Sequence, residues 1–182
     1  MSKADEYQAG DAQGARIEPV ADDWVLVVER RLRHSPAKVW QAITDPEQLR
    51  QWAPFDADRN LAQSGMAKLS TVGTPEPHVT ETEIKRAEAP TLLELSWGDN
   101  DMRWQLEALD DGGTLLTLWH SIGRDYIAMG AAGWHICFDV LRHYLDGDPL
   151  GRIVGADAMA HGWPKLLQQY GEQFEARRSG KA

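Results

Sequence analysis

The chain has 182 residues, of which 42% are hydrophobic and 26% charged, so it can bury a core without disulfides or bound metals. Its formal net charge of −9 argues against a nucleic-acid or anionic-membrane partner, since both require clustered Lys and Arg. Cys137 is the only cysteine, which excludes an internal disulfide, and the opening residues contain no apolar run typical of a secretory signal. We therefore expect a cytoplasmic protein.

The first residues lack a periodic pattern. Gly, Ala, Asp and Gln dominate residues 1–20, which we expect to be a mobile tail, followed by a single domain over residues 21–178. Residues 23–35 predict a strand on which Leu26, Val28 and Leu32 share one face. Arg30 has the same parity as these apolar residues, so it either anchors a ligand carboxylate or pairs with an acid on a facing helix.

Two short helices are predicted next, over residues 35–52. Ser35 can cap the first helix, and Pro36 suits its first position. Asp45 can cap the second, with Gln48 three residues later in a capping-box arrangement. The inward residues of this clasp are expected to be Val39, Trp40, Ile43, Leu49 and Trp52.

Residues 65–122 predict a run of antiparallel strands joined by short turns, because apolar and polar residues alternate with period two. Residues 78–88 are interpreted as one of these strands. GDND and DDGG supply turn signals between later strands. On each strand one set of side chains shares a face: Thr80, Thr82 and Ile84; Leu93, Leu95 and Trp97; Met102, Trp104, Leu106 and Ala108; Leu116, Leu118 and His120. Trp97 and Trp104 are expected to face inward, and His120 points into the cavity if Leu116 and Leu118 do.

The C-terminal part is predicted to be helical, over residues 126–146 and again over 163–178. A strand, two short helices, a meander and a long helix indicate an α+β fold with one antiparallel sheet. If that sheet is curved, the long helix lies across its concave side, and a gap between the two becomes a cavity.

The spacing of His135, Asp139 and His143 on the long helix raises the question of a metal site. At about 100° per residue, these three fall opposite the apolar stripe of Trp134, Phe138 and Leu141. They share their arc with charged residues, which is typical of a solvated face, so we expect no metal there. His135 and Asp139 are expected to pair at i, i+4. Cys137 lies on the apolar side and is expected to be a buried, unreactive thiol.

His120 and two tryptophans are the main candidates for contact with a ligand. His120 shares parity with Leu118 on the last strand, so it either touches a ligand or is a core histidine bonded to a backbone carbonyl or a tyrosine. Trp97 and Trp104 either stack on a planar ligand or fill the core. Trp40, Trp52 and Trp163 are expected to be packing residues.

Several segments resemble the SRPBCC superfamily, the START-like helix-grip fold, and its branch related to activators of the Hsp90 ATPase. They are SPAKVWQAITDPEQLRQW, GTLLTLWHSIG and AAGWHICFDVLRHYLDG followed by HGWPKLLQQYGEQF. The resemblance implies a curved antiparallel sheet wrapped around a long C-terminal helix, two short helices between the first two strands, and a terminal helix. It also implies a deep apolar cavity in which members bind lipids, hormones or polyketide-like molecules. It implies no catalytic residues that could be assigned to positions of this sequence, and no cofactor.

Leu115 and Trp119 lie on the outer face of the last predicted strand, where relatives commonly carry charged residues. This departure suggests that the face contacts the tail or another subunit.

The first functional hypothesis is non-enzymatic binding of a small hydrophobic or aromatic molecule between sheet and helix. A cyclase or hydrolase with His120 as general acid or base is the alternative, together with an interaction module that contacts a chaperone or a second copy around Trp119. The residues expected to line the cavity are Trp97, Trp104, Leu106, Leu118, His120, Phe138 and Leu141.

Overall fold

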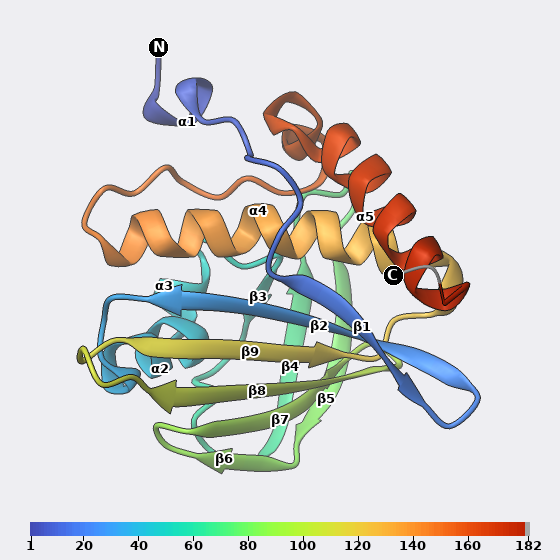
Figure 1. Cartoon of the computed structure of the whole chain (residues 1–182). Coiled ribbons are helices and arrows are strands. Elements are labelled where there is room, and N and C mark those ends of the chain that lie inside the picture. The colour runs from blue at the N-terminus through green and yellow to red at the C-terminus, as the bar shows by residue number, and fades with distance from the viewer. Residues whose placement is uncertain (181–182) are drawn as a thin grey trace.

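The computed structural model describes residues 1–180 and divides its strands between two antiparallel sheets (Figure 1). The strands are β1 (Ala15–Val20), β2 (Asp23–Leu32), β3 (Phe55–Ala57), β4 (Gly65–Thr71), β5 (His78–Ile84), β6 (Arg86–Glu88), β7 (Leu92–Trp97), β8 (Asn100–Ala108) and β9 (Thr114–His120). The helices are α1 (Lys3–Glu6), α2 (Pro36–Thr44), α3 (Pro46–Leu49), α4 (Ile127–Leu145) and α5 (Trp163–Arg178), with 3₁₀ turns η1 (Arg124–Tyr126) and η2 (Gly155–His161).

The larger sheet has the strand order β1-β2-β9-β8-β7-β6, and the smaller has the order β3-β4-β5. Figure 1 shows α4 lying across the large sheet, with α5 packed on the other side of α4. The predicted α+β helix-grip fold is therefore confirmed. The expected single sheet is corrected, because the chain changes sheets at Lys85 and splits the strand predicted over 78–88 into β5 and β6.

The apolar stripe of α4 faces the strands, as its helical spacing predicts. Trp134, Phe138 and Leu141 are each at most 3% exposed. They belong to one continuous core that also includes the clasp of α2 and α3 and the inner faces of the strands. Burial of such large side chains is worth roughly 1.5–3 kcal/mol each, so this stripe fixes α4 against the sheet.

Side-chain hydrogen bonds of the N-cap residues Ser35 and Asp45 define where α2 and α3 begin. The Ser35 hydroxyl accepts a hydrogen bond from the Lys38 backbone N–H at 3.3 Å. The Asp45 carboxylate accepts from the Glu47 backbone N–H at 2.9 Å, so Asp45 caps α3 without the capping box expected from Gln48. Trp52 is completely buried, and its indole N–H donates to the Ala42 carbonyl of α2 at 2.9 Å, which ties the residues after α3 back to α2.

The N-terminal residues differ from the expected mobile tail. Residues 15–20 form β1, which pairs with β2 at the edge of the large sheet, with Ala15 and Ile17 buried. Ahead of β1, the Ala9 backbone N–H donates to the His161 carbonyl at 3.0 Å. Buried and exposed residues alternate over too few positions of β1 for the strand to be recognised in the sequence. Pro19, which has no backbone N–H to donate, is tolerated because β1 is an edge strand.

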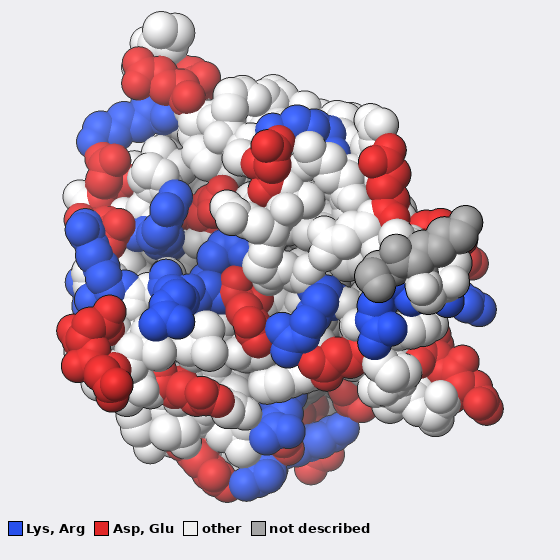
Figure 2. All heavy atoms as spheres, viewed as in Figure 1, with Lys and Arg blue, Asp and Glu red and all other residues white. Residues whose placement is uncertain are grey.

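The surface in the view of Figure 2 carries acidic and basic side chains interspersed, rather than one continuous basic area. Within residues 1–180, none of the helices combines the length and the apolar character required to span a bilayer.

Candidate functional site

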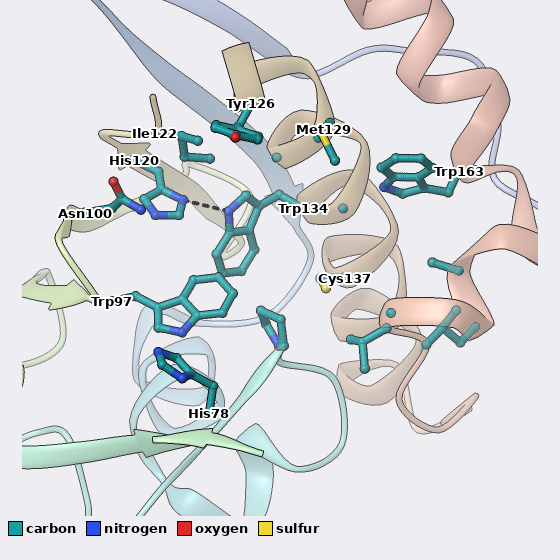
Figure 3. Close-up of a pocket in the computed structure, with 18 of the residues that line it drawn as sticks. His78, Trp97, Asn100, His120, Ile122, Tyr126, Met129, Trp134, Cys137 and Trp163 are labelled. Atoms are coloured by element: carbon teal, nitrogen blue, oxygen red, sulfur yellow. Dashed lines mark hydrogen bonds between the residues drawn. The ribbon is translucent and has the colours of Figure 1, made fainter. Parts of the chain in front are cut away.

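A cavity of about 690 Å³ lies between the N-terminal half of α4 and the strand ends that face it. Its walls are formed by the start of β5, the turn between β7 and β8, the end of β9, the first three turns of α4, and the segment from Ile153 to Trp163. Exposed side chains of Tyr126, Met129 and Met159 border it, so the cavity reaches the surface there. Figure 3 shows these walls converging on one space.

Two glycines of α4, Gly130 and Gly133, border the cavity. A side chain at Gly133 would meet no atom within 4 Å of its Cβ, because this position faces the cavity. Gly130, one turn earlier, packs closely on Ile122, whose terminal methyl group would lie 2.3 Å from a Cβ at this position. A glycine inside a helix costs roughly 0.5–1 kcal/mol relative to alanine, so the open wall at Gly133 is maintained at the expense of helix stability.

Three indole rings supply the aromatic walls: Trp97 from β7, Trp134 from α4 and Trp163 from α5. The Trp97 N–H donates to the Thr71 hydroxyl at 3.1 Å, which ties this ring to the smaller sheet. Trp97 and Trp134 meet edge to face, with centroids 6.1 Å apart. These contacts fix the rings of Trp97 and Trp134 in place in the ligand-free protein.

His120 is the buried polar group of this wall. It is 2% exposed, and its Nδ1 accepts a hydrogen bond from the Trp134 indole N–H at 3.0 Å (Figure 3). The imidazole also stacks on Trp97, with an interplanar angle of 21°. Burial lowers the pKa of His120 from 6.5 to about 4, so the ring is neutral at physiological pH. The bonding partner is an indole rather than the expected carbonyl or tyrosine.

Two of the seven residues expected to line the cavity, Trp97 and His120, border it. The other five lie in the core behind it and do not reach its surface; they are Trp104, Leu106, Leu118, Phe138 and Leu141. The physical reason is that Trp104 packs directly against Trp134 and Phe138, with centroid distances of 5.4 and 6.0 Å, and so closes the space between α4 and the centre of the sheet.

Trp163 was expected to be a packing residue, and Trp134 was assigned only to the apolar stripe of the long helix; both border the cavity. The small residues of AMGAAG, residues 128–133, were the sequence signal for its position, because they leave one stretch of the helix without bulk. Cys137 also borders the cavity. Its thiol is buried, and burial raises its pKa to about 12, which agrees with the expectation of an unreactive cysteine.

The opposite side of α4 is not the solvated face predicted for His135. His135 is 2% exposed, because α5 and the N-terminal segment cover it, and its Nδ1 lies 2.7 Å from the Tyr170 hydroxyl. Burial chiefly, and then the Arg30 charge, lower its pKa to about 4. Its Nε2 lies 3.6 Å from the Asp139 carboxylate, the i, i+4 partner expected from the sequence.

Asp139 is the centre of a polar network on this side of α4. It accepts a hydrogen bond from the Tyr7 hydroxyl at 2.7 Å and lies 3.8 Å from the Arg30 guanidinium. Arg30 therefore pairs with an acid of the facing helix and does not reach the cavity. Within residues 1–180, the structure assembles no cluster of three or more His, Cys, Asp and Glu that could hold a metal ion.

The outer face of β9 is partly covered by the chain itself. The Arg103 guanidinium lies over the Trp119 ring, 5.3 Å from its centroid. Leu115 and Trp119 are both half-buried. The expected contact of this face with another subunit or a chaperone stays a prediction.

The sheet, the long helix across it and the cavity beneath that helix define a helix-grip protein, a fold that supports a ligand-binding domain. The family model of the activator of Hsp90 ATPase homolog 1-like proteins matches residues 33–146, more than half of the chain. The chain belongs to this family, as its clasp, last strand and long helix suggested.

Solved structures show the same fold. A conserved protein of unknown function from Enterococcus faecalis is 16% identical, with a TM-score of 0.69 over 90% of this chain and 91% of that one. CalU16 from Micromonospora echinospora, solved by NMR, is 24% identical, with a TM-score of 0.67 over 97% and 98%. DynU16, a putative protein in the dynemicin biosynthetic locus, is 20% identical, with a TM-score of 0.59 over 70% and 49%. The comparison with curated proteins gives no match.

Proposed function

We propose that the protein binds a small, largely apolar aromatic molecule in the cavity between α4 and the strand ends, without changing it chemically. The observation that carries this proposal is the cavity itself: about 690 Å³ of space walled by three indoles and reaching the surface. Its volume lies within the roughly 300–1,000 Å³ typical of small-molecule sites. Burial of apolar ligand surface, at about 25 cal/mol per Å², would provide most of the affinity.

The chemistry of the cavity walls favours binding over catalysis. The pKa of His120, lowered to about 4, makes it a poor proton acceptor near neutrality, and the pKa of Cys137, raised to about 12, makes it a poor nucleophile. Among residues 1–180, the cavity lining includes no Asp or Glu, the usual acid or base of a hydrolase; besides His120 and Cys137, its titratable side chains are His78, at the start of β5, and the exposed Tyr126. A neutral aromatic molecule is the class of ligand that such a wall suits.

The test uses the open position at Gly133. Gly133→Phe would direct a ring into the cavity, since nothing lies within 4 Å of a Cβ at this position. Gly171→Phe is the matched control, because Gly171 is also inside a helix with no atom within 4 Å of its Cβ, and it does not border the cavity. The probe is N-phenyl-1-naphthylamine, a neutral aromatic dye whose emission rises in apolar surroundings.

We expect the wild type and Gly171→Phe to bind the dye with equal affinity, and Gly133→Phe to bind at least about tenfold more weakly while it unfolds at a similar denaturant concentration. Equal dye binding by all three proteins would place the dye elsewhere and remove the support for this function. A failure of the folded wild type to bind any of a panel of neutral aromatic dyes would do the same.

A further inference from the structure

The hydrogen bond between Trp134 and His120 determines which ring nitrogen of His120 carries the proton. An indole N–H can only donate, so Nδ1 of His120, 3.0 Å away, must be the acceptor and carries no hydrogen. Burial keeps the ring neutral, and a neutral imidazole has one proton. That proton is therefore on Nε2, which makes His120 a hydrogen-bond donor.

This donor is left without a partner. Nε2 of His120 is buried and makes no hydrogen bond with any of residues 1–180. Asn100 lies beside the imidazole in Figure 3, on the cavity wall, and no hydrogen bond joins the two side chains. Native proteins rarely leave a buried donor unpaired, because the group loses its bond to water and gains nothing in return.

A second unpartnered polar atom belongs to the same cavity. The Thr80 hydroxyl of β5 is buried at its oxygen and has no hydrogen-bond partner in the described part of the chain. Only four buried side-chain nitrogens and oxygens of residues 1–180 lack a partner, and two of them belong to residues that border this cavity. This largely apolar cavity is thus bordered by two residues that each carry an unsatisfied polar atom.

We propose that His120 Nε2–H is the group that orients the ligand, and that the cavity selects planar aromatic molecules carrying a hydrogen-bond acceptor such as a ketone or quinone carbonyl. This inference rests on the proposed function and adds the chemical class of its ligand. The stack of Trp97 on His120 supports it, because it holds the imidazole plane and so fixes the direction of the N–H bond. The Thr80 hydroxyl, which both donates and accepts, is the second polar contact for such a molecule.

A matched pair of compounds tests this selection. 9-Fluorenone and fluorene are planar tricyclic molecules that differ by one carbonyl oxygen, so their affinity ratio reports the hydrogen bond rather than the apolar contact. We expect the wild type to bind fluorenone about three- to tenfold more tightly than fluorene, the range that one net hydrogen bond contributes. His120→Phe retains a flat ring and removes the donor, so it should bind the two compounds with equal affinity.

Two spectroscopic measurements make the assignment specific. Long-range ¹H–¹⁵N spectra of histidine should show the proton of His120 on Nε2 in the free protein. The carbonyl stretch of bound fluorenone should lie at lower frequency than in hexane, and this shift should vanish in His120→Phe. Fluorene affinity, unchanged between wild type and variant, controls for the fold of the cavity.

The outcomes separate this inference from the proposed function. Equal affinities for fluorenone and fluorene in the wild type would overturn the selection and leave apolar binding intact. A fluorenone preference that survives in His120→Phe would place the donor on another residue and overturn the assignment to His120. If the wild type binds neither compound, the inference fails, and dye binding in the Gly133 experiment decides the proposed function independently.

Discussion

The buried neutral imidazole of His120 makes the stability of the protein depend on pH in a way that one substitution isolates. In His120→Gln the side-chain oxygen can still accept from the Trp134 indole, and the residue no longer titrates. The folded protein holds the pKa of His120 at about 4, while the unfolded chain returns it to 6.5. Because the folded pKa is the lower one, the unfolded state binds more protons between these two values.

The wild type should therefore lose stability as pH falls from 7 to 4, whereas above pH 7 the contribution of His120 is constant. A gap of about 2.5 pKa units, at about 1.4 kcal/mol per unit, corresponds to roughly 3–4 kcal/mol in full, of which about 3 kcal/mol is lost by pH 4, and His120→Gln should not show this loss. His135 also has its pKa lowered to about 4, but it is present in both proteins and cancels in the comparison.

Urea unfolding, followed by tryptophan fluorescence at pH values from 4 to 8, measures this difference. The free energy of unfolding of the wild type should fall more steeply with acid than that of the variant, with the two curves parallel above pH 7. If the curves stay parallel down to pH 4, His120 does not lie in the dry environment that the structure gives it, and the argument for a fixed Nε2–H tautomer fails with it.

Three further predictions follow from single side chains. Gly133→Ala should raise the free energy of unfolding by about 0.5–1 kcal/mol, because its Cβ enters open space and stiffens a helix; destabilisation in urea would show that the space is filled. Tyr7→Phe should cost about 1–2 kcal/mol through loss of the bond to Asp139, whereas the exposed Tyr126→Phe should be neutral; equal effects would mean that the N-terminal segment does not dock. Cys137 should react with iodoacetamide at pH 8 only as fast as the chain opens, as mass spectrometry would show, and reaction at the rate of a free thiol would contradict its raised pKa.

Local patterns in the sequence were enough for most of the fold. Ser35 and Asp45 cap their helices through atoms two or three residues away, so the clasp could be predicted from sequence alone. The orientation of α4 followed from the spacing of Trp134, Phe138 and Leu141, because a helical periodicity defines which face is buried against a sheet.

The burial of His135 and the position of the cavity could not be predicted from the sequence, because both depend on packing between segments that are distant in the chain. His135 lies on the polar arc of α4, yet α5 and the N-terminal segment bury it, and a helical periodicity contains no information about such a third layer. The position of the cavity along α4 depends on where Trp104 fills the gap beneath the helix and where Gly133 leaves it open. For this reason Trp97 and His120 were identified as lining residues, and Trp134 and Trp163 were not.

The eight tryptophans allow the central claim to be tested in one spectrum. Trp97, Trp134 and Trp163 border the cavity, while Trp24 and Trp119 lie outside it. Titration of ¹⁵N-labelled protein with N-phenyl-1-naphthylamine should shift the indole signals of the first three most strongly and leave those of Trp24 and Trp119 in place. The largest shifts at Trp24 or Trp119, or an unchanged spectrum at saturating dye, would show that aromatic molecules do not enter the space beneath α4.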